Sequence, residues 1–325
     1  MLEFVRKRWF LLGIIVGVVL AWFAPEALVW TLPITPQLVI GPGLFLMAWT
    51  LPTDDLRGAL SRPWPGLWAT FLSFTVVPGL ASVSGLFSFV PDDVAVGLLI
   101  IASGPCTLAS VVIWTRMADG NEATALLVIV WTSCVSVGAT SAWLAWTTST
   151  SVELSAWDMA LKLFQAMLVP MGLGQLFRLY KPAARFATDH KKLLSSIAQL
   201  SILLIVWKAC ADMGTRFQQA PEDISVVLLV TAVGMPVGVH LATLFVGLLT
   251  SQVLGFAHKD QIAIAFASSQ KTLPVALLLF GTFYRGTHPL AVLPIAFYHF
   301  GQLIVDTVIA ERLRKHKPTG EPDAN

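Results

Sequence analysis

The amino-acid sequence predicts an all-α polytopic membrane protein with ten transmembrane helices in two inverted five-helix repeats. Three observations lead to this fold class: an apolar composition, ten apolar stretches of about spanning length, and a motif that occurs once in each half. Of the 325 residues, 56% are hydrophobic and 12% are charged, whereas a soluble domain carries about 25% charged residues. With a mean hydropathy of +0.74, lipid is the solvent that fits most of the outer surface.

The apolar stretches are separated by charged residues or by Pro and Gly. A helix needs about 20 apolar residues to cross the hydrocarbon; most stretches approach this length, although the second and seventh are short. Arg6-Lys7-Arg8 imitates the start of a signal peptide, but the apolar run that follows exceeds the ~7–15 residues of such a signal. We therefore expect a first transmembrane helix. The ten stretches cover residues 9–30, 37–52, 66–89, 94–115, 123–147, 157–177, 193–210, 224–250, 260–283 and 287–309.

The Lys and Arg residues predict the orientation. Cytoplasmic segments of membrane proteins carry an excess of these residues. With a cytoplasmic N-terminus, 16 of them fall in cytoplasmic segments and only Lys208, Arg216 and Arg285 fall outside, while Lys162 and Lys271 lie within spans. We expect a multi-pass protein of the cell (plasma or inner) membrane with both termini cytoplasmic.

An odd number of spans in each half makes the second half inverted relative to the first. The predicted units are a first repeat over residues 1–150, a second over 151–315, and a cytoplasmic tail over 316–325. Residues 101–108 (IASGPCTL) and 266–273 (FASSQKTL) agree at four of eight positions. Each lies in the fourth span of its half, so these segments support the duplication.

Spans four and nine are expected to be broken helices. Pro105 removes a backbone N–H and clashes with the preceding turn, and Gly104 is permissive; Pro274 has the same effect in span nine. If the breaks cross, half-helix N-termini present partial positive charge and C-termini partial negative charge to one small volume. Interrupted segments at matching places point to a transporter's binding site.

The Ser, Thr and Gly residues of these segments have a simpler interpretation, in which they only let helices pack closely. Lys271 favours a binding site over this interpretation. An ionisable residue at the centre of a span costs at least ~2.5 kcal/mol and indicates function. No metal site is predicted. The candidate substrate- or ion-binding residues are Ser103, Pro105, Cys106, Thr107, Ser110, Ser268, Ser269, Gln270, Lys271 and Thr272.

These segments resemble a known family. Residues 103–110 (SGPCTLAS) and the turn 119–122 (DGNE) are similar to the fourth helix of the bile acid:sodium symporter family, which is related to arsenite-efflux permeases. Residues 268–274 (SSQKTLP) resemble its ninth-helix motif, in the symporter-like branch with Lys after Gln. Tyr298-His299 and Gln302-Leu303 resemble its last helix.

The resemblance implies a fold and a function. Spans 1, 2, 6 and 7 would form a panel, and spans 3–5 and 8–10 a core that carries the crossing helices. The protein would be a secondary-active transporter of a small organic anion, working by alternating access. Apart from Na⁺ or H⁺ as coupling ion, we expect no cofactor, and the partners are the anionic substrate and the lipid bilayer, with no nucleic acid. Substrate, direction and oligomeric state stay open.

The departures from the family concern sodium. Its sodium-coupled members carry a sodium-ligating Glu where this chain has Phe266, and oxygen-bearing side chains where it has Val111, Ala125 and Ile129. We therefore hypothesise that the Lys271 ammonium occupies the sodium region, held by half-helix carbonyls, Ser110 and Gln270. It would either couple transport to protons, since burial depresses a Lys pKa, or act as a fixed charge.

Other functions follow from weaker signals. A Cys106 thiolate would suit As(III) in a metalloid permease, although a buried Cys is commonly packing. A non-transporting membrane regulator is a further alternative. No P-loop, metalloprotease motif or paired mid-membrane carboxylates occur, so we expect no enzyme. His240 and His299 could relay protons or serve as structural histidines, and Asp306 is expected to reach the cytoplasmic interface.

Overall fold

The computed structural model describes residues 2–52, 60–108, 110–148, 155–219 and 225–315, and the regular elements within these ranges are all helical. The predicted tail over 316–325 and the predicted boundary between the halves at residues 150 and 151 lie outside the described residues.

Seven helical segments in the described ranges are long and apolar enough to cross a membrane, and an eighth apolar helix is shorter (Leu38–Thr50). The chain is therefore a multi-pass membrane protein. The seven segments are Trp64–Ser84, Glu122–Thr147, Ala156–Leu179, Lys191–Asp212, Val226–Val253, His258–Tyr284 and Pro289–Arg314.

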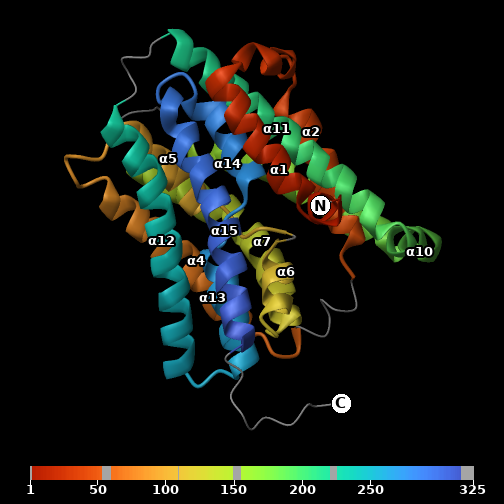
Figure 1. Cartoon of the computed structure of the whole chain (residues 1–325). Helices are drawn as coiled ribbons and strands as arrows, with labels where there is room; N and C mark the ends of the chain where they lie inside the picture. The colour runs from red at the N-terminus through yellow and green to blue at the C-terminus, as the bar shows by residue number, and fades with distance from the viewer. Residues whose placement is uncertain (1, 53–59, 109, 149–154, 220–224, 316–325) are drawn as a thin grey trace.

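The helices pack into two groups, which Figure 1 shows on different sides of the molecule. In the smaller group, α11 contacts α1 and α2, and α2 contacts α9. This group contains α1 (Leu2–Phe23), η1 (Pro25–Thr31), α2 (Pro36–Thr50), α8 (Ala156–Leu163), the π-helix η2 (Phe164–Leu168), α9 (Val169–Leu179), α10 (Lys181–Asp189) and α11 (Lys191–Gln219). Of these, α8 leads into η2 and also contacts α7 of the larger group.

In the larger group, α12 contacts α13, α15 and α4, and α4 contacts α13, α7 and α5. It contains α4 (Trp64–Ser84), α5 (Asp92–Ser103), α6 (Ser110–Met117), α7 (Glu122–Thr148), α12 (Val226–Val253), α13 (His258–Ser269), α14 (Leu273–Leu279), the π-helix η4 (Phe280–Tyr284), η5 (Pro289–Ala291) and α15 (Val292–Lys315). We call the face where α6 and α15 end the C-terminal face, and the face where α5 begins the opposite face.

Three features differ from the sequence-based expectations. The first helix ends at Phe23 rather than near Trp30, because Pro25 starts a separate 3-10 helix and a proline cannot continue the preceding turn. The prediction of a short seventh span is wrong, since α11 has 29 residues; its polar ends hid its length. The basic loop after span six contains a helix, α10.

The two expected breaks are present. After α5, Gly104 is extended with ψ 168°, as a residue before proline prefers. After α13, Gln270 and Thr272 are extended, and Pro274 lies in the first turn of α14, where its missing N–H has no helical partner to lose. The break therefore precedes Pro274. In the broken span His258–Tyr284, every residue of the most apolar window is buried, so protein surrounds the unwound backbone.

Close backbone contacts hold each group together. A Cβ on Gly97 of α5 would lie 2.1 Å from the Ala291 carbonyl oxygen, and one on Gly214 of α11 would lie 2.4 Å from that of Ala21. Wherever a Cβ on a described glycine would come within 3.0 Å of another helix, both helices belong to the same group. The tightest glycine contacts are therefore within the groups and not between them.

Candidate functional site

The two broken helices touch each other at their breaks. The backbone N–H of Thr272 donates to the carbonyl oxygen of Pro105 over 3.0 Å. Residues on both sides of this contact are buried, so unpaired backbone groups there would be costly. Two segments more than 160 residues apart thus form one crossover, as the duplicated motif predicts.

The C-terminal end of α5 is neutralised by Lys271. Its ammonium group donates to the Gly104 carbonyl over 2.9 Å, and to the carbonyl and hydroxyl oxygens of Ser73 on α4 over 2.7 and 2.8 Å. Three acceptors match the three donors of an ammonium group. The expected contact with a half-helix carbonyl is present, through Gly104. Ser110 and Gln270, however, do not hold Lys271, because its side chain points the other way, toward α4.

The backbone of Lys271 is fixed by Gln302 of α15. The Lys271 N–H donates to Gln302 Oε1 over 2.8 Å, and Gln302 Nε2 donates to the Lys271 carbonyl over 2.9 Å. His299 Nδ1 lies 2.9 Å from Gln302 Nε2. A bidentate amide contact of this kind satisfies both groups that the break leaves free.

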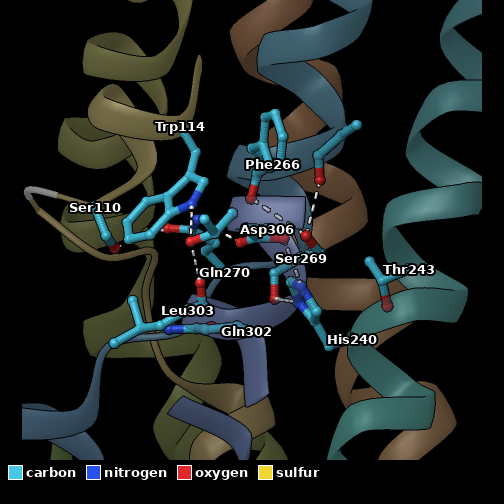
Figure 2. A network of polar contacts seen from close by, with 12 residues as sticks. Ser110, Trp114, His240, Thr243, Phe266, Ser269, Gln270, Gln302, Leu303 and Asp306 are labelled. Carbon is cyan, nitrogen blue, oxygen red and sulfur yellow. Dashed lines mark hydrogen bonds and ion pairs between the residues drawn. The ribbon is translucent and has the colours of Figure 1, made fainter. Parts of the chain in front are cut away.

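Gln270 joins the crossover to α15. Its amide nitrogen donates to Asp306 Oδ2 over 2.6 Å, and its carbonyl oxygen accepts from Thr107 over 2.6 Å and Ser110 over 2.9 Å. Figure 2 shows Gln270 between Ser110 on one side and Asp306 on the other. Because a carboxylate only accepts, the Gln270 amide has one favourable orientation.

A buried His–Asp pair completes the network. His240 Nε2 lies 2.8 Å from Asp306 Oδ1, and both side chains are fully buried. His240 Nδ1 lies 3.3 Å from the Ser269 carbonyl oxygen, which also accepts from the Tyr298 hydroxyl over 2.8 Å. The expectation that Asp306 reaches the cytoplasmic interface is wrong. It lies nine residues before the end of α15, about 14 Å along the helix, and turns inward to His240 and Gln270.

A cavity of about 300 Å³ borders the crossover between the two helix groups. It lies on the side toward the C-terminal face, since residues along α6 and α15 line it. None of the lining residues is Asp, Glu, Lys or Arg. They are Trp9, Leu44, Met47, Gln199 and Ile202 of the smaller group, and Thr107, Leu108, Ser110, Ile113, Trp114, Met117, Thr272, Pro274, His299, Leu303 and Thr307 of the larger group.

A second cavity, of about 710 Å³, lies between α2, the segment η2–α9 and the segment α14–η4. Lys162 and Gln165 are on its wall, and none of the ten predicted site residues is. The cavity at the crossover is therefore the candidate substrate site.

The ten predicted site residues have three different positions. Thr107, Ser110 and Thr272 line the cavity. Gln270 and Lys271 lie directly behind it, with Pro105 and Ser269 supplying the carbonyl contacts described above. The remaining three, Ser103, Cys106 and Ser268, are buried without lining the cavity.

The contacts of those three residues are structural. The Ser103 carbonyl accepts from Thr140, and the Ser268 hydroxyl donates back to Ala265. The Cys106 N–H donates to Thr132, and Cys106 belongs to an apolar cluster. Cys106 thus gives the arsenite hypothesis no support from the cavity.

Sequence reasoning missed Ser73 and Asp306. Ser73 is one of several hydroxyl residues in an apolar span, and nothing local connects it to Lys271. Asp306 could have been found, because an ionisable residue within a span indicates function; counting its distance from the helix end would have placed it too deep to reach water.

The residues that replace the family's sodium ligands are buried among apolar neighbours. Phe266, Val111, Ala125 and Ile129 are each 0% exposed and belong to one hydrophobic cluster. Sodium, a hard cation, needs several oxygen ligands, and these side chains offer none.

The turn 119–122, which the resemblance singled out, is a structural joint. Asp119 has φ 60°, and Asn121 Oδ1 accepts from the Ala123 N–H at the start of α7. Asn121 Nδ2 donates to Asp260 of α13 over 2.7 Å. The turn therefore fixes the two broken helices to each other at the C-terminal face.

Comparisons with known proteins identify the family of the chain. The profile of the SBF-like CPA transporter family matches residues 8–315. The chain is similar to the probable sodium/metabolite cotransporter BASS4, chloroplastic, of Arabidopsis thaliana, with 27% identity over 85% of this chain and 66% of that protein. It is also similar to sodium/bile acid cotransporter 7-B of Xenopus laevis and sodium/bile acid cotransporter 7 of Rattus norvegicus, each with 24% identity over 97% of this chain and 94% of the relative. The chain belongs to the SBF-like CPA transporter family, and with it to the bile acid:sodium symporter family that its crossover motifs resemble.

Proposed function

We propose that this protein is a secondary-active transporter that carries a small organic anion through the cavity at the crossover. One observation supports this most: the starts of the half-helices α6 and α14 border the cavity, while the helix ends that carry negative partial charge are occupied by the protein's own side chains. Lys271 binds the carbonyl after α5, and His240 and Tyr298 lie at the last carbonyl of α13.

The charge arrangement favours an anion. The helix starts carry partial positive charge, and the hydroxyls of Thr107, Ser110 and Thr272 can donate to carboxylate or sulfonate oxygens. A volume of about 300 Å³ is at the lower limit for ligand sites, which supports a small substrate.

The mechanism we propose is alternating access of ten spans in two inverted repeats. The smaller group serves as the panel and the larger group as the core. Exchanging α1 with α9 and α2 with α11 preserves the contacts of the smaller group, as an inverted repeat requires. The cavity lies at the boundary of the two bodies, so a displacement of one against the other would expose it to alternate faces.

The C-terminal face is assigned to the cytoplasm on the distribution of Lys and Arg. In this conformation the cavity faces the cytoplasm. On the opposite face, Arg285 and Asp212 form an ion pair of 2.7 Å between the groups, and Lys162 lies 4.6 Å from the Phe283 ring centre. These contacts support an inward-facing state that is closed toward the outside.

The test is uptake into proteoliposomes of radiolabelled gluconate, succinate and taurocholate, with an imposed sodium gradient, an imposed proton gradient, or neither. The variants are Thr107→Val and Ser110→Ala, and the control is Thr75→Val, whose hydroxyl bonds only within α4 on an exposed surface. Each cavity variant should raise KM about 10- to 150-fold, since losing a hydrogen bond to an ion costs about 1.5–3 kcal/mol.

Uptake that is unchanged in both cavity variants would reject the site. An absence of protein-dependent flux of all three anions, from folded protein, would reject the transporter itself and favour the regulator alternative.

A further inference from the structure

We propose that the His240–Asp306 pair is the proton-binding site that couples transport to a proton gradient, with Lys271 as a fixed charge. The inference rests on the proposed transport function and identifies its coupling ion. It begins from the one ion pair that the described residues form at the crossover.

Proton counting on His240 carries the argument. Its two ring nitrogens face two acceptors, the Asp306 carboxylate and the Ser269 carbonyl. A neutral imidazole has one N–H, so beside an ionised carboxylate one nitrogen lone pair would face an oxygen lone pair. One additional proton completes both hydrogen bonds, either as an imidazolium with a carboxylate or as a neutral imidazole with a carboxylic acid. The geometry is therefore that of a pair loaded with a proton.

Gln270 links this pair to the anion. Its oxygen accepts from Thr107 and Ser110, which line the cavity, and its nitrogen donates to Asp306. An anion that takes the two hydroxyl hydrogens leaves the Gln270 oxygen without donors. The bound anion also places negative charge one amide away from the pair, which stabilises the positive charge that the added proton brings to the pair. Anion and proton thus favour each other's binding, as symport requires.

Lys271 is not the titrating group. All three of its ammonium hydrogens have oxygen acceptors, and removing a proton would leave one of those acceptors buried and unpaired. A fixed cation also sets the charge balance. Lys271 and the Asp306 carboxylate cancel, so a proton and a monoanion enter the core together without net charge.

The surroundings of His240 contain few other titratable groups. From α15 it is faced by Asp306 and Tyr298, and His299 is the residue after Tyr298. The breaks carry Lys271 and Cys106, which interact with each other and, for Cys106, with Asp306. In α4 there is no titratable residue, α5 has Asp92 and Asp93 in its first turn, and α13 has only His258, Lys259 and Asp260 in its own first turn. Proton occupancy therefore depends on the pair and its link to Gln270.

The experiment uses the full chain in proteoliposomes that are more acidic outside by one pH unit, with gluconate as the monoanionic probe and protein-free vesicles as the leak control. One proton per monoanion predicts about tenfold accumulation in the wild type, independent of an imposed membrane potential. Asp306→Asn and His240→Gln should lower accumulation to equilibrium while exchange of labelled for unlabelled gluconate continues. His288→Gln is the matched control, a buried histidine remote from the crossover.

Several outcomes would overturn the inference. These are accumulation that persists in both variants, or that follows sodium instead of protons. If both variants misfold, a pH dye in the lumen of wild-type vesicles decides: gluconate entry without acidification rejects proton coupling. If the wild type moves none of the three anions, the proposed function fails separately. The inference is then tested on purified protein, where a shift from pH 6 to 9 must release more protons from wild type than from the double variant.

Discussion

The Lys271 ammonium is held by backbone and hydroxyl oxygens and lies 5.1 Å from the centre of the Phe74 ring, and no described carboxylate is at bonding distance. A buried charge persists only when hydrogen bonds replace its hydration. Each of the three acceptors should therefore contribute measurably to stability, and the hydroxyl of Ser73 is the one that a substitution can remove without moving the backbone.

Ser73→Ala is expected to lower the free energy of unfolding in detergent by about 1–3 kcal/mol, because it leaves one ammonium hydrogen buried and unpaired. The control is Ser82→Ala on the same helix, whose hydroxyl donates only to the Pro78 carbonyl. Equal effects of the two substitutions would show that Ser73 does not support Lys271.

Asp93, just before the predicted fourth span, gives a pH-dependent prediction. Burial raises the pKa of its carboxyl group, although the Leu290 N–H donates to it over 2.9 Å. Its contribution to stability is present below the unfolded pKa of about 3.9 and is lost as pH rises through the folded pKa. Asp93→Asn, which keeps an acceptor for Leu290, should raise the unfolding temperature at pH 7. The gain should vanish near pH 4; a gain that grows on acidification would contradict this.

At the residue scale, a charged residue in the middle of a span can be recognised from the sequence, whereas the residues that hydrogen-bond to it cannot. Lys271 was found because charge within a span is costly. Its partner Ser73 is 198 residues away and resembles any hydroxyl of an apolar helix. The wrong position for Asp306 came from treating a residue near a span's end as able to reach water, when its partners lie inside.

At the scale of elements, the breaks could be predicted and the helix ends could not. Gly104-Pro105 and Pro274 act through local backbone chemistry, so their effects are visible in the sequence. α11 packs against α1, α2 and η1, and a count of apolar residues along the chain does not register such contacts between helices.

The close contact between α5 and η5 yields a prediction for these elements. Gly97→Ala should lower the unfolding temperature sharply and reduce the yield of monodisperse protein, because its Cβ would lie 2.1 Å from a backbone oxygen and 2.6 Å from Pro294. Overpacking typically costs 1–3 kcal/mol, and backbone cannot move aside as a flexible side chain can. In Gly138→Ala, the Cβ on α7 meets nothing within 4 Å, so stability should hold or increase. Equal effects of Gly97→Ala and Gly138→Ala on the unfolding temperature would show that α5 and η5 are not in tight contact at Gly97.

At the scale of the whole molecule, composition and charge distribution sufficed for a multi-pass helical protein, and the duplicated motif suggested the crossover. The cavity between the groups could not be predicted, since it depends on which conformation of the two bodies is populated. Arg285 contacts Asp212, which is 73 positions away along the chain, and Lys162 contacts Phe283, which is still farther away. No local sequence pattern encodes contacts over such separations.

Asp212→Asn is expected to shift the population toward a state open at the opposite face. A partly exposed ion pair contributes about 0–1 kcal/mol, so the ratio of states should change up to about fivefold. The measurement is the rate at which an impermeant maleimide labels Thr282→Cys in a Cys134→Ser background, since Cys134 is exposed and the other cysteines are buried. A rate that is unchanged or lower would contradict a closing role for the pair.

Because of the ion pair at the opposite face, the two faces of the protein should respond differently to salt concentration. Arg285 is about half exposed, with 45% of its side chain accessible, and dissolved salt screens such a pair, the Debye length falling from about 10 Å at 0.1 M to about 3 Å at 1 M. The cavity on the other side is lined by no Asp, Glu, Lys or Arg. Ionic strength at the opposite face should therefore alter the ease with which that face opens, while ionic strength at the C-terminal face should leave the cavity largely unaffected.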